Sequence, residues 1–438
     1  MNIIISGAGK VGFNLAKKLS IGHNITIIDK NIEALYRIQD DLDVMVLHGD
    51  VEESKTFEKV IDKNINLFIA VTNIDNTNLI SCLIADTILT IDKKFIRLKK
   101  ETFNNPELKS RLNIDKFIFP IELASNIIAS LLSYPKANNV KFFKYTKNKL
   151  ISIIVSKDFQ PSIINQSYFR IVGIKRDKEF FIPNSSDIKI MANDLIYLFG
   201  DEEKIKVICK ETALESSSNI DKCVVFGAGD LGIAISKRLV KEGCVVKLLD
   251  KDLNLCNRAN DKLGGMVSVI NLKYSSHEVF ETEGLDSADI FIASTDNDEF
   301  NIIKSLEAKE RGIKKVISIN NDLEYYSLMY SLGITVVRGP KISAYNTIME
   351  EINSTKIILE KNFCGIKGIL FMRKIFSNSK LINKTIQAPN SFDGLIFYIR
   401  NDDIFNLNSS LLLEKDDLIV IFVKSKIGSD IKKWLYEL

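Results

Sequence analysis

A glycine-rich stretch follows the first apolar run of this sequence, Ile3-Ile4-Ile5. Three glycines spaced G-x-G-x-x-G lead into an amphipathic segment, and an acid ends the next apolar run about 20 residues later. This order predicts a strand, a tight turn and a helix of a dinucleotide-binding domain, because glycine permits the turn, the approach of a pyrophosphate and close helix packing. The candidate contacts are Gly7, Ala8, Gly9, Lys10, Val11, Gly12 and Asp29.

The same pattern returns in the second half of the chain. Gly227 follows Gly7 by 220 residues, and Asp250 follows Asp29 by 221. Further landmarks keep nearly the same spacing, with 223 residues from Thr72 to Thr295. The sequence therefore predicts a tandem duplication. The candidate contacts of the second copy are Gly227, Ala228, Gly229, Asp230, Leu231, Gly232, Asp250 and Thr295.

Alternating apolar runs and helical patterns predict a doubly wound parallel sheet in the first half. Strands are expected at 44–47, 67–71, 95–98 and 117–119, with helices at 10–20, 75–88 and 121–133. In the strand order 3-2-1-4-5-6, the carboxyl end of the fourth strand faces the glycine turn across the crevice where ligands bind. The residues expected near this crevice are Gly49, Asp50, Thr72, Asn73 and Arg97.

Two of these assignments have structural alternatives that the sequence leaves open. Thr72 and Asn73 could cap the helix at 75–88 instead of facing a ligand. Arg97 could meet a phosphate, or it could be a solvated or inter-domain arginine. The helix at 121–133 is apolar on more than one face, so we expect it to reach a neighbouring subunit.

A change of pattern near residue 140 predicts a small α+β domain after each parallel domain. Short strands are expected at 150–155, 171–175, 180–182 and 195–199, and Arg400 follows Arg176 by 224 residues. A polar stretch at 215–219 is expected to link the halves. The predicted fold class is α/β, with two Rossmann-type domains at 1–136 and 220–353 and two small α+β domains at 137–214 and 354–438.

Fewer of the candidate binding residues near the first glycine turn are repeated near the second. Asn271-Leu272 stands where the first half has Gly49-Asp50, and Ser318 stands where it has Arg97. Asp230 places a negative charge near a would-be phosphate, or it caps the following helix. We therefore expect the second site to be weaker or to take another nucleotide.

Composition excludes several classes of function. The 59 basic and 56 acidic residues give a net charge of +3, so no polycationic surface argues for nucleic acid. The six cysteines form no C-x-x-C pair and are expected to be reduced, buried thiols of a cytosolic protein. No run approaches the ~18 apolar residues of a membrane span, so a soluble chain that docks to a membrane protein is expected.

The order of glycine turn, acid, T-x-x-D-x-x-N and small α+β domain, repeated once, resembles the TrkA family of Trk potassium-uptake regulatory subunits. The matching motifs are Gly7-Ala8-Gly9-x-x-Gly12, Ala70-Val71-Thr72-Asn73-x-Asp75-x-x-Asn78 and Ala293-Ser294-Thr295-Asp296-x-Asp298-x-x-Asn301. The resemblance implies two tandem RCK units that bind NAD(H) or the adenine nucleotides ATP and ADP. It also implies a peripheral cytoplasmic subunit, a dimer or tetramer ring that controls K⁺ uptake beneath a TrkH or TrkG membrane subunit.

The alternative function is an NAD-dependent oxidoreductase, which would need a proton donor or acceptor beside the nicotinamide. Of the three histidines, His23 and His277 are expected far from the glycine turn. His48 ends the third strand near the crevice, where packing at the edge of the site is the expected role. Neither glycine turn is accompanied by a catalytic or metal-ligating set, so a non-enzymatic regulator is expected. An acid at Asp29 favours NAD(H) or an adenosine nucleotide over NADP(H).

Overall fold

The computed structural model describes eleven stretches of the chain and groups them into two compact units. The described stretches are 1–60, 64–134, 137–155, 169–183, 189–205, 220–272, 281–353, 358–365, 367–389, 392–407 and 410–438. One unit joins 1–126 with 221–349, and the other joins 127–220 with 350–438. The predicted linker at 215–219 lies outside the described residues. The four domain limits remain predictions.

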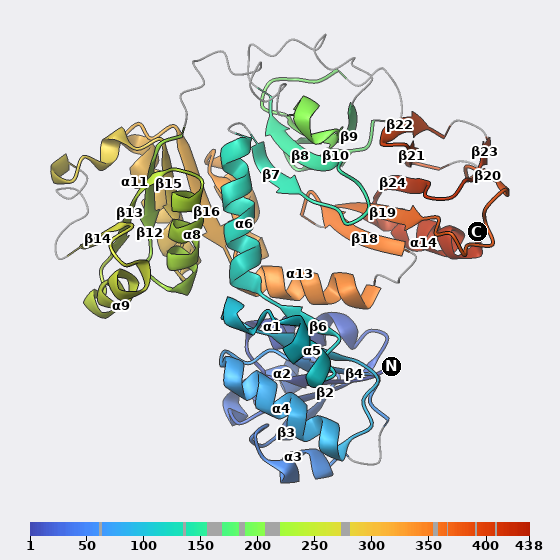
Figure 1. The fold of residues 1–438 in the computed structure, drawn as a ribbon, viewed down its shortest axis with the longest axis horizontal. Coiled ribbons are helices and arrows are strands. Elements are labelled where there is room, and N and C mark those ends of the chain that lie inside the picture. The colour runs from blue at the N-terminus through green and yellow to red at the C-terminus, as the bar shows by residue number, and fades with distance from the viewer. Residues whose placement is uncertain are drawn as a thin grey trace. The chain divides into compact units, whose positions relative to one another are not determined.

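The first unit contains a six-stranded parallel sheet built from the N-terminal part of the chain. Its order, β3-β2-β1-β4-β5-β6, confirms the predicted doubly wound arrangement. Figure 1 shows this domain in blue, with its helices around the strands. The strands are β1 (Asn2–Ser6), β2 (Asn24–Asp29), β3 (Met45–His48), β4 (Leu67–Ala70), β5 (Lys94–Arg97) and β6 (Lys116–Ile118). The helices are α1 (Lys10–Leu19), α2 (Ile32–Asp41), α3 (Ser54–Glu58), α4 (Asp75–Ile88), α5 (Pro106–Arg111) and α6 (Pro120–Ser133).

Burial explains why these segments form a sheet covered by helices. All four residues of β4 and all four of β5 are buried, as expected for parallel strands packed on both faces. Helix α1 buries Val11, Leu15, Ala16 and Leu19 at helical spacing and exposes Lys17 and Lys18 in its last turn. Those lysines also suit the negative end of the helix dipole.

The same unit contains a second parallel sheet of the same order, β14-β13-β12-β15-β16-β17. Its strands are β12 (Lys222–Phe226), β13 (Val245–Asp250), β14 (Ser268–Asn271), β15 (Ile290–Ala293), β16 (Lys315–Asn320) and β17 (Thr335–Arg338). Its helices are α8 (Asp230–Lys241), α9 (Leu253–Leu263), α11 (Asp298–Glu310), α12 (Tyr326–Ser331) and α13 (Pro340–Asn353). The identical order confirms the duplicated fold.

The strand registers correct two of the predicted equivalences by one residue. Asp29 pairs with His48, whereas Asp250 pairs with Asn271, so Asn271 corresponds to His48 and not to Gly49. Likewise Ala70 pairs with Ile96 and Ala293 pairs with Ser318, so Ser318 corresponds to Ile96. The counterpart of Arg97 is therefore Ile319, which is fully buried.

The second unit contains two antiparallel five-stranded sheets of matching order, β10-β9-β11-β8-β7 and β22-β21-β24-β19-β18. The first has β7 (Ala137–Lys141), β8 (Lys149–Ile154), β9 (Phe169–Arg176), β10 (Glu179–Phe181) and β11 (Leu195–Gly200). The second has β18 (Ile358–Phe363), β19 (Gly368–Lys374), β21 (Gly394–Arg400), β22 (Asp403–Asn406) and β24 (Leu418–Lys424). A short pair, β20 (Thr385–Gln387) with β23 (Ser410–Leu412), and helix α14 (Gly428–Glu437) complete this part.

Aromatic rings join the two small sheets within this unit. The ring of Phe363 lies 5.2 Å from that of Tyr197 and 5.4 Å from that of Phe180, measured between centroids. Phe199 and Phe422 are likewise 5.2 Å apart. These edge-to-face contacts connect residues of the two halves, so the small domains pack against each other through one aromatic core.

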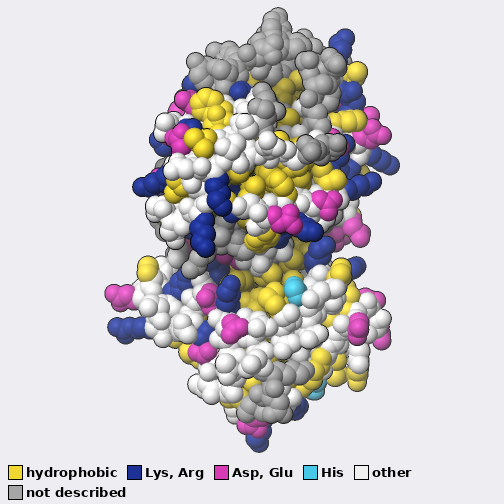
Figure 2. All heavy atoms as spheres, turned by 90° about the vertical axis from the view of Figure 1, so that its right-hand side faces the viewer, with side chains coloured by type: hydrophobic (Ala, Val, Ile, Leu, Met, Phe, Trp, Pro, Cys, Tyr) yellow, Lys and Arg dark blue, Asp and Glu magenta, His cyan; other side chains and the backbone are white. Residues whose placement is uncertain are grey.

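No helix among the described residues combines the length and apolarity that crossing a bilayer requires. On the face shown in Figure 2, basic and acidic side chains are interspersed and do not separate into a field of one sign. This distribution agrees with the small net charge of +3.

Candidate functional site

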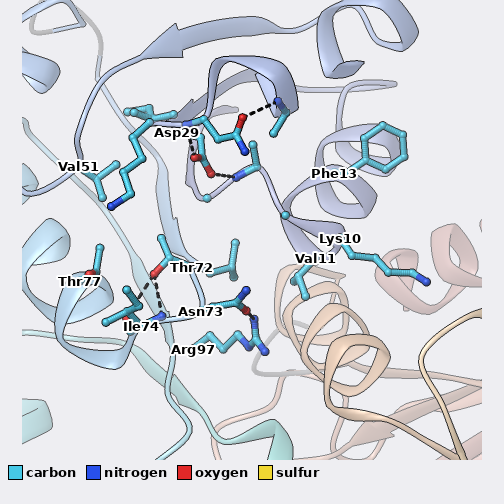
Figure 3. Close-up of a pocket in the computed structure, with 18 of the residues that line it drawn as sticks. Lys10, Val11, Phe13, Asp29, Val51, Thr72, Asn73, Ile74, Thr77 and Arg97 are labelled. Carbon is cyan, nitrogen blue, oxygen red and sulfur yellow. Dashed lines mark hydrogen bonds between the residues drawn. The ribbon is translucent and has the colours of Figure 1, made fainter. Parts of the chain in front are cut away.

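The first glycine turn borders a cavity of 1160 Å³ at the carboxyl end of its parallel sheet (Figure 3). This is the position where doubly wound sheets bind ligands, because the strand order reverses there. Ten of the predicted residues line it, namely Gly7, Ala8, Gly9, Lys10, Val11, Asp29, Asp50, Thr72, Asn73 and Arg97. Gly12 and Gly49 lie beside the cavity but do not line it.

The three glycines of the turn meet three different geometric demands. Gly7 has φ of 111°, a conformation that side chains other than glycine rarely adopt. A Cβ at Gly12 would lie 1.9 Å from the carbonyl oxygen of Gly7, so only glycine lets α1 start this close to the turn. A Cβ at Gly9 would meet nothing within 4 Å, so the space over Gly9 is open to the cavity.

Asp29 is fixed at the end of β2 by two backbone groups. The N–H of Ala8 donates to its Oδ2 at 2.6 Å, and the N–H of Asn31 donates to its Oδ1 at 2.8 Å. A carboxylate keeps free lone pairs after accepting two hydrogen bonds. Asp29 is therefore held beside the glycine turn while still able to accept from hydroxyl groups in the cavity.

Of the T-x-x-D-x-x-N residues, Thr72 lines the cavity, and Asn78 holds it in place. The Oγ1 of Thr72 donates to Oδ1 of Asn78 at 2.6 Å, and Nδ2 of Asn78 donates to the carbonyl oxygen of Arg97 at 2.8 Å. The residue that caps α4 is Ile74, so the alternative that Thr72 and Asn73 cap this helix is wrong. Asn78 instead ties the end of β4 to the end of β5.

Arg97 is the most unusual charged group of the cavity. It is 7% exposed, its Nη1 donates to Oδ1 of Asn73 at 3.3 Å, and its Nε has no hydrogen-bond partner. Burial lowers its pKa from the usual value, although the carboxylates of Asp75 and Asp296 partly oppose this effect. A buried guanidinium with an unsatisfied donor is costly unless an anion or another acceptor meets it.

Thr56 packs against the residues that follow β3. A Cβ at Gly49 would lie 2.7 Å from Oγ1 of Thr56, and that hydroxyl donates to the carbonyl oxygen of Asp50 at 2.6 Å. His48 Nε2 lies 3.1 Å from the carbonyl oxygen of Lys30, and in the second half Nδ2 of Asn271 donates to the carbonyl oxygen of Lys251 at the same distance. His48 is exposed and does not line the cavity, so its packing role stays a prediction.

Lys341 lines the cavity although no sequence pattern pointed to it. It is the second residue of α13, in the second half of the chain, yet it lines the cavity of the first glycine turn. Its backbone N–H donates to Oδ1 of Asn321 at 3.2 Å. No motif near Pro340-Lys341 could place it there, because the contact depends on how the two parallel domains pack within the unit.

The second glycine turn repeats the backbone geometry but differs in charge. Ala228 N–H donates to Oδ2 of Asp250 at 2.6 Å, as Ala8 does to Asp29. Asp230 is the first residue of α8, and its side chain does not cap that helix. It forms ion pairs with Arg258 and, at 3.2 Å, with Lys262, both on α9.

The remaining predicted residues of the second copy repeat contacts and backbone geometry of the first copy. Thr295 Oγ1 donates to Oδ1 of Asn301 at 2.6 Å, which repeats the contact between Thr72 and Asn78. Gly227 has φ of 108°, and a Cβ at Gly232 would lie 1.8 Å from the carbonyl oxygen of Gly227. Gly229 is the N-cap of α8, and Leu231 is buried in that helix. Within the described part of the chain, no group of three His, Cys, Asp or Glu side chains could hold a metal ion.

Comparison with known proteins agrees with this duplicated site. The TrkA-N domain model matches the chain twice, at residues 3–120 and 223–340. The Trk system potassium uptake protein TrkA homolog 1 of Methanosarcina mazei is 24% identical over 99% of this chain and 100% of its own length. The Trk system potassium uptake protein TrkA of Vibrio alginolyticus is 26% identical over 99% of this chain and 98% of its own length.

Solved structures share the whole fold at low sequence identity. The GsuK RCK domain covers 100% of this chain and 95% of that chain, with a TM-score of 0.63 and 14% identity. The GsuK channel bound to NAD covers 100% of this chain and 79% of that chain, with the same TM-score and identity. The family model accounts for more than half of the residues, in two copies that coincide with the two parallel domains. The chain belongs to the TrkA-N domain family.

Proposed function

We propose that this chain is a nucleotide-binding regulatory subunit of a potassium-uptake system. Relatives that span its full length are named Trk system potassium uptake proteins. A structure of similar fold is a channel bound to NAD. The cavity beside Gly7 would hold the nucleotide, and its occupancy would control K⁺ uptake by a separate membrane subunit.

The observation that carries this proposal is that Asp29 and Arg97 line the same cavity. Asp29 offers acceptors beside the glycine turn, where a ribose would lie. Arg97 offers a buried donor without a partner, which suits a phosphate or another acceptor of the ligand. We propose NAD(H) as the main ligand, with ATP and ADP as competitors, because a 2′-phosphate would be repelled by Asp29.

The ligand would act by favouring one arrangement of the parallel domains over another. A nucleotide shifts such an equilibrium only by the difference between its affinities for the two arrangements, typically about 1–3 kcal/mol per site. The proposed assembly is a homo-oligomeric ring, a dimer or tetramer, at the cytoplasmic face of a TrkH- or TrkG-type subunit. The cavity would bind the cofactor without turning it over.

The test is a titration of the purified full chain with NADH, NAD⁺, NADPH, ATP and ADP, followed by calorimetry. Asp29→Ala should weaken NADH binding by about tenfold or more, since it removes a charged hydrogen-bond partner. Asp250→Ala is the matched control in the second copy and should change the affinity of the first site little. Failure of every nucleotide to bind the wild type would refute the proposal, and turnover of NADH would favour the oxidoreductase instead.

The partner needs a separate measurement. The chain should co-purify in mild detergent with a potassium-translocating membrane subunit, and Asp29→Ala should retain that complex. In vesicles that contain both proteins, NADH should change the K⁺ flux of the wild-type complex but not that of the Asp29→Ala complex. An unchanged flux with the wild type would contradict the regulatory role even where the nucleotide binds.

A further inference from the structure

A second cavity lies between the two parallel domains of the first unit. Its volume is 680 Å³, which is within the range of about 300–1000 Å³ of small-molecule sites. The first half contributes the loops that follow β4 and β5 and the start of α6, and the second half contributes α8 and α9. Asn73, Ile74 and Asn76 line both this cavity and the one beside Gly7, so the two cavities adjoin.

One face of α8 forms the wall contributed by the second half. Asp230, Ile233, Lys237 and Lys241 all line the cavity, and their spacing of three or four residues places them on one side of the helix. Facing them are Lys99 and Lys100, which follow β5. The cavity therefore has lysines on both of its opposing walls.

The acidic residues of the cavity balance only part of its positive charge. Asp75 accepts hydrogen bonds from the backbone N–H groups of Lys99 and Lys100, at 2.9 and 3.0 Å. Asp230 is paired with Arg258 and Lys262, and Glu122 lies 3.8 Å from Arg238.

Six basic side chains line the cavity, namely Lys99, Lys100, Lys237, Arg238, Lys241 and Lys262, against four acidic ones, Asp75, Glu101, Glu122 and Asp230. Within the described stretches, no ion pair engages the ammonium groups of Lys99, Lys100, Lys237 or Lys241. The cavity thus keeps an excess of positive charge that a bound anion would offset.

The corresponding positions on the other side of the two parallel domains form an ion pair. There Lys10 Nζ lies 2.8 Å from Oδ2 of Asp322. By their positions in the two halves, Lys10 corresponds to Asp230, and Asp322 corresponds to Lys100. The acid and the base have exchanged places between the two sides, so Asp230 and Lys100 could form the same pair. Asp230 instead pairs with Arg258 and Lys262 of its own domain. Lys100 is thereby left without the partner that its counterpart has.

We infer that the cavity between Lys99-Lys100 and the Lys237–Lys241 face of α8 binds a compact phosphate ligand that carries several negative charges. Lysine ammonium groups recognise phosphate oxygens as point charges. The ligand has two sources: the triphosphate tail of a nucleotide seated beside Gly7, or a free oligophosphate. Either source would bridge the two parallel domains, and this site is distinct from the Asp29 contact on which the proposed function rests.

The test uses inorganic tripolyphosphate and the full chain, by calorimetry at low salt and without divalent cations. The test variant is Lys237→Gln/Lys241→Gln. Both positions are exposed on α8, and glutamine favours a helix about as well as lysine does. The control is Lys17→Gln/Lys18→Gln, two exposed lysines on α1, the counterpart of α8, that line neither cavity. We expect the test variant to bind tripolyphosphate about tenfold more weakly or worse, and the control to bind as the wild type does.

Titrations with ATP distinguish a nucleotide tail from a free oligophosphate as the ligand. A nucleotide tail predicts that both Asp29→Ala and Lys237→Gln/Lys241→Gln weaken ATP binding. A free oligophosphate predicts that tripolyphosphate still binds after saturation with NADH and that the lysine variant leaves ATP affinity unchanged. NADH affinity should be normal in the lysine variant in both cases. Equal binding of tripolyphosphate and ATP by wild type and test variant would overturn the inference, as would an equal loss in the control.

Discussion

Lys10 Nζ lies 2.8 Å from Oδ2 of Asp322, and this ion pair joins the first glycine turn to the second parallel domain. Lys10 also lines the cavity beside Gly7, and Asp322 follows β16. The hydrogen bond from Lys10 lowers the pKa of the Asp322 carboxyl, against the opposing effect of its partial burial. A group that would meet the ligand is thus linked directly to the other half of the chain.

We expect this pair to contribute little to stability and to be sensitive to salt. The two side chains are 40% and 32% exposed, and such pairs are worth roughly 0.2–1 kcal/mol. Lys10→Glu should lower the free energy of unfolding by that amount, and Lys10→Glu/Asp322→Lys should recover it. The check is a double-mutant cycle in urea at about 0.05 and 1 M salt. A coupling energy that persists at high salt would contradict the exposed geometry.

Two glycine substitutions in the first turn should have opposite consequences. Gly12→Ala places a Cβ within 1.9 Å of a backbone oxygen, so α1 must move, and we expect a loss of about 2 kcal/mol or more. Gly9→Ala meets nothing within 4 Å and should leave the melting temperature almost unchanged.

Nucleotide binding separates the roles of these two glycines. In Gly9→Ala the new methyl group occupies the space over the turn, where a pyrophosphate would approach. We expect normal unfolding and weaker NADH binding in this variant, measured by calorimetry. Unchanged affinity in Gly9→Ala would place the pyrophosphate elsewhere.

Much of the fold could be predicted from the sequence because its signals are local. Helix α4 begins at Asp75 and ends at Ile88, the limits that the apolar spacing predicts. The predicted strand order is confirmed because a glycine turn, an acid and alternating apolar runs fit one topology. The equivalence of Arg97 and Ser318 was wrong by one residue, since sequence offsets do not fix register where loop lengths differ between the halves.

The candidate site was predicted only where its residues come from one domain. Asp29, Thr72 and Arg97 follow strands of the same sheet, so the carboxyl edge brings them together. Lys341 and the lysine cavity depend on the packing of two domains separated by about half of the chain. No local pattern encodes that packing, because it depends on the shapes of both folded domains.

Replacing Arg97 should separate ligand binding from stability. Its burial and unsatisfied Nε disfavour the charged form in the free protein, so Arg97→Met should leave the unfolding free energy unchanged or raise it by about 1–3 kcal/mol. The same variant should lose NADH affinity by about tenfold or more. Thermal unfolding with and without NADH measures both effects, and Lys17→Met on the exposed face of α1 is the control. A large destabilisation of the free protein would show that the guanidinium of Arg97, through its contact with Asn73, stabilises the fold and is not held in reserve for a ligand.

The described cysteines should be unreactive while the chain is folded. Cys82, Cys223, Cys244, Cys256 and Cys364 are buried thiols outside any disulfide, and burial raises the pKa of Cys82 to about 12. Thiolate is the reactive form, so these groups should react slowly with a thiol reagent at pH 8 and quickly after unfolding in urea. Rapid modification of any of the five in the native protein, located by peptide mapping, would contradict the packing at that residue.

We expect the first small domain to lose stability in acid, because it contains an ion pair between a partly exposed arginine and a buried aspartate. Arg176 donates from Nε and Nη2 to Asp194 at 2.8 and 2.7 Å, and Arg400 repeats both distances with Asp417. Burial opposes the ionisation of Asp194, but the hydrogen bonds from Arg176 and from Met191 N–H outweigh it and lower the pKa of its carboxyl.

The sign of the pH effect follows from that lowered pKa. The stabilisation by Asp194 is fully present above the unfolded-state pKa of about 3.9 and is lost as the pH falls through the lower folded-state pKa. Asp194→Asn should therefore cost about 1.5–3 kcal/mol at pH 7, and this difference from the wild type should shrink below about pH 4. Asp177→Asn, in an exposed turn with φ of 50° that Asn tolerates, is the control and should show no such convergence. Melting temperatures from pH 7 to pH 3 provide the measurement, and a difference that stays constant over this range would show that Asp194 is not held ionised by Arg176.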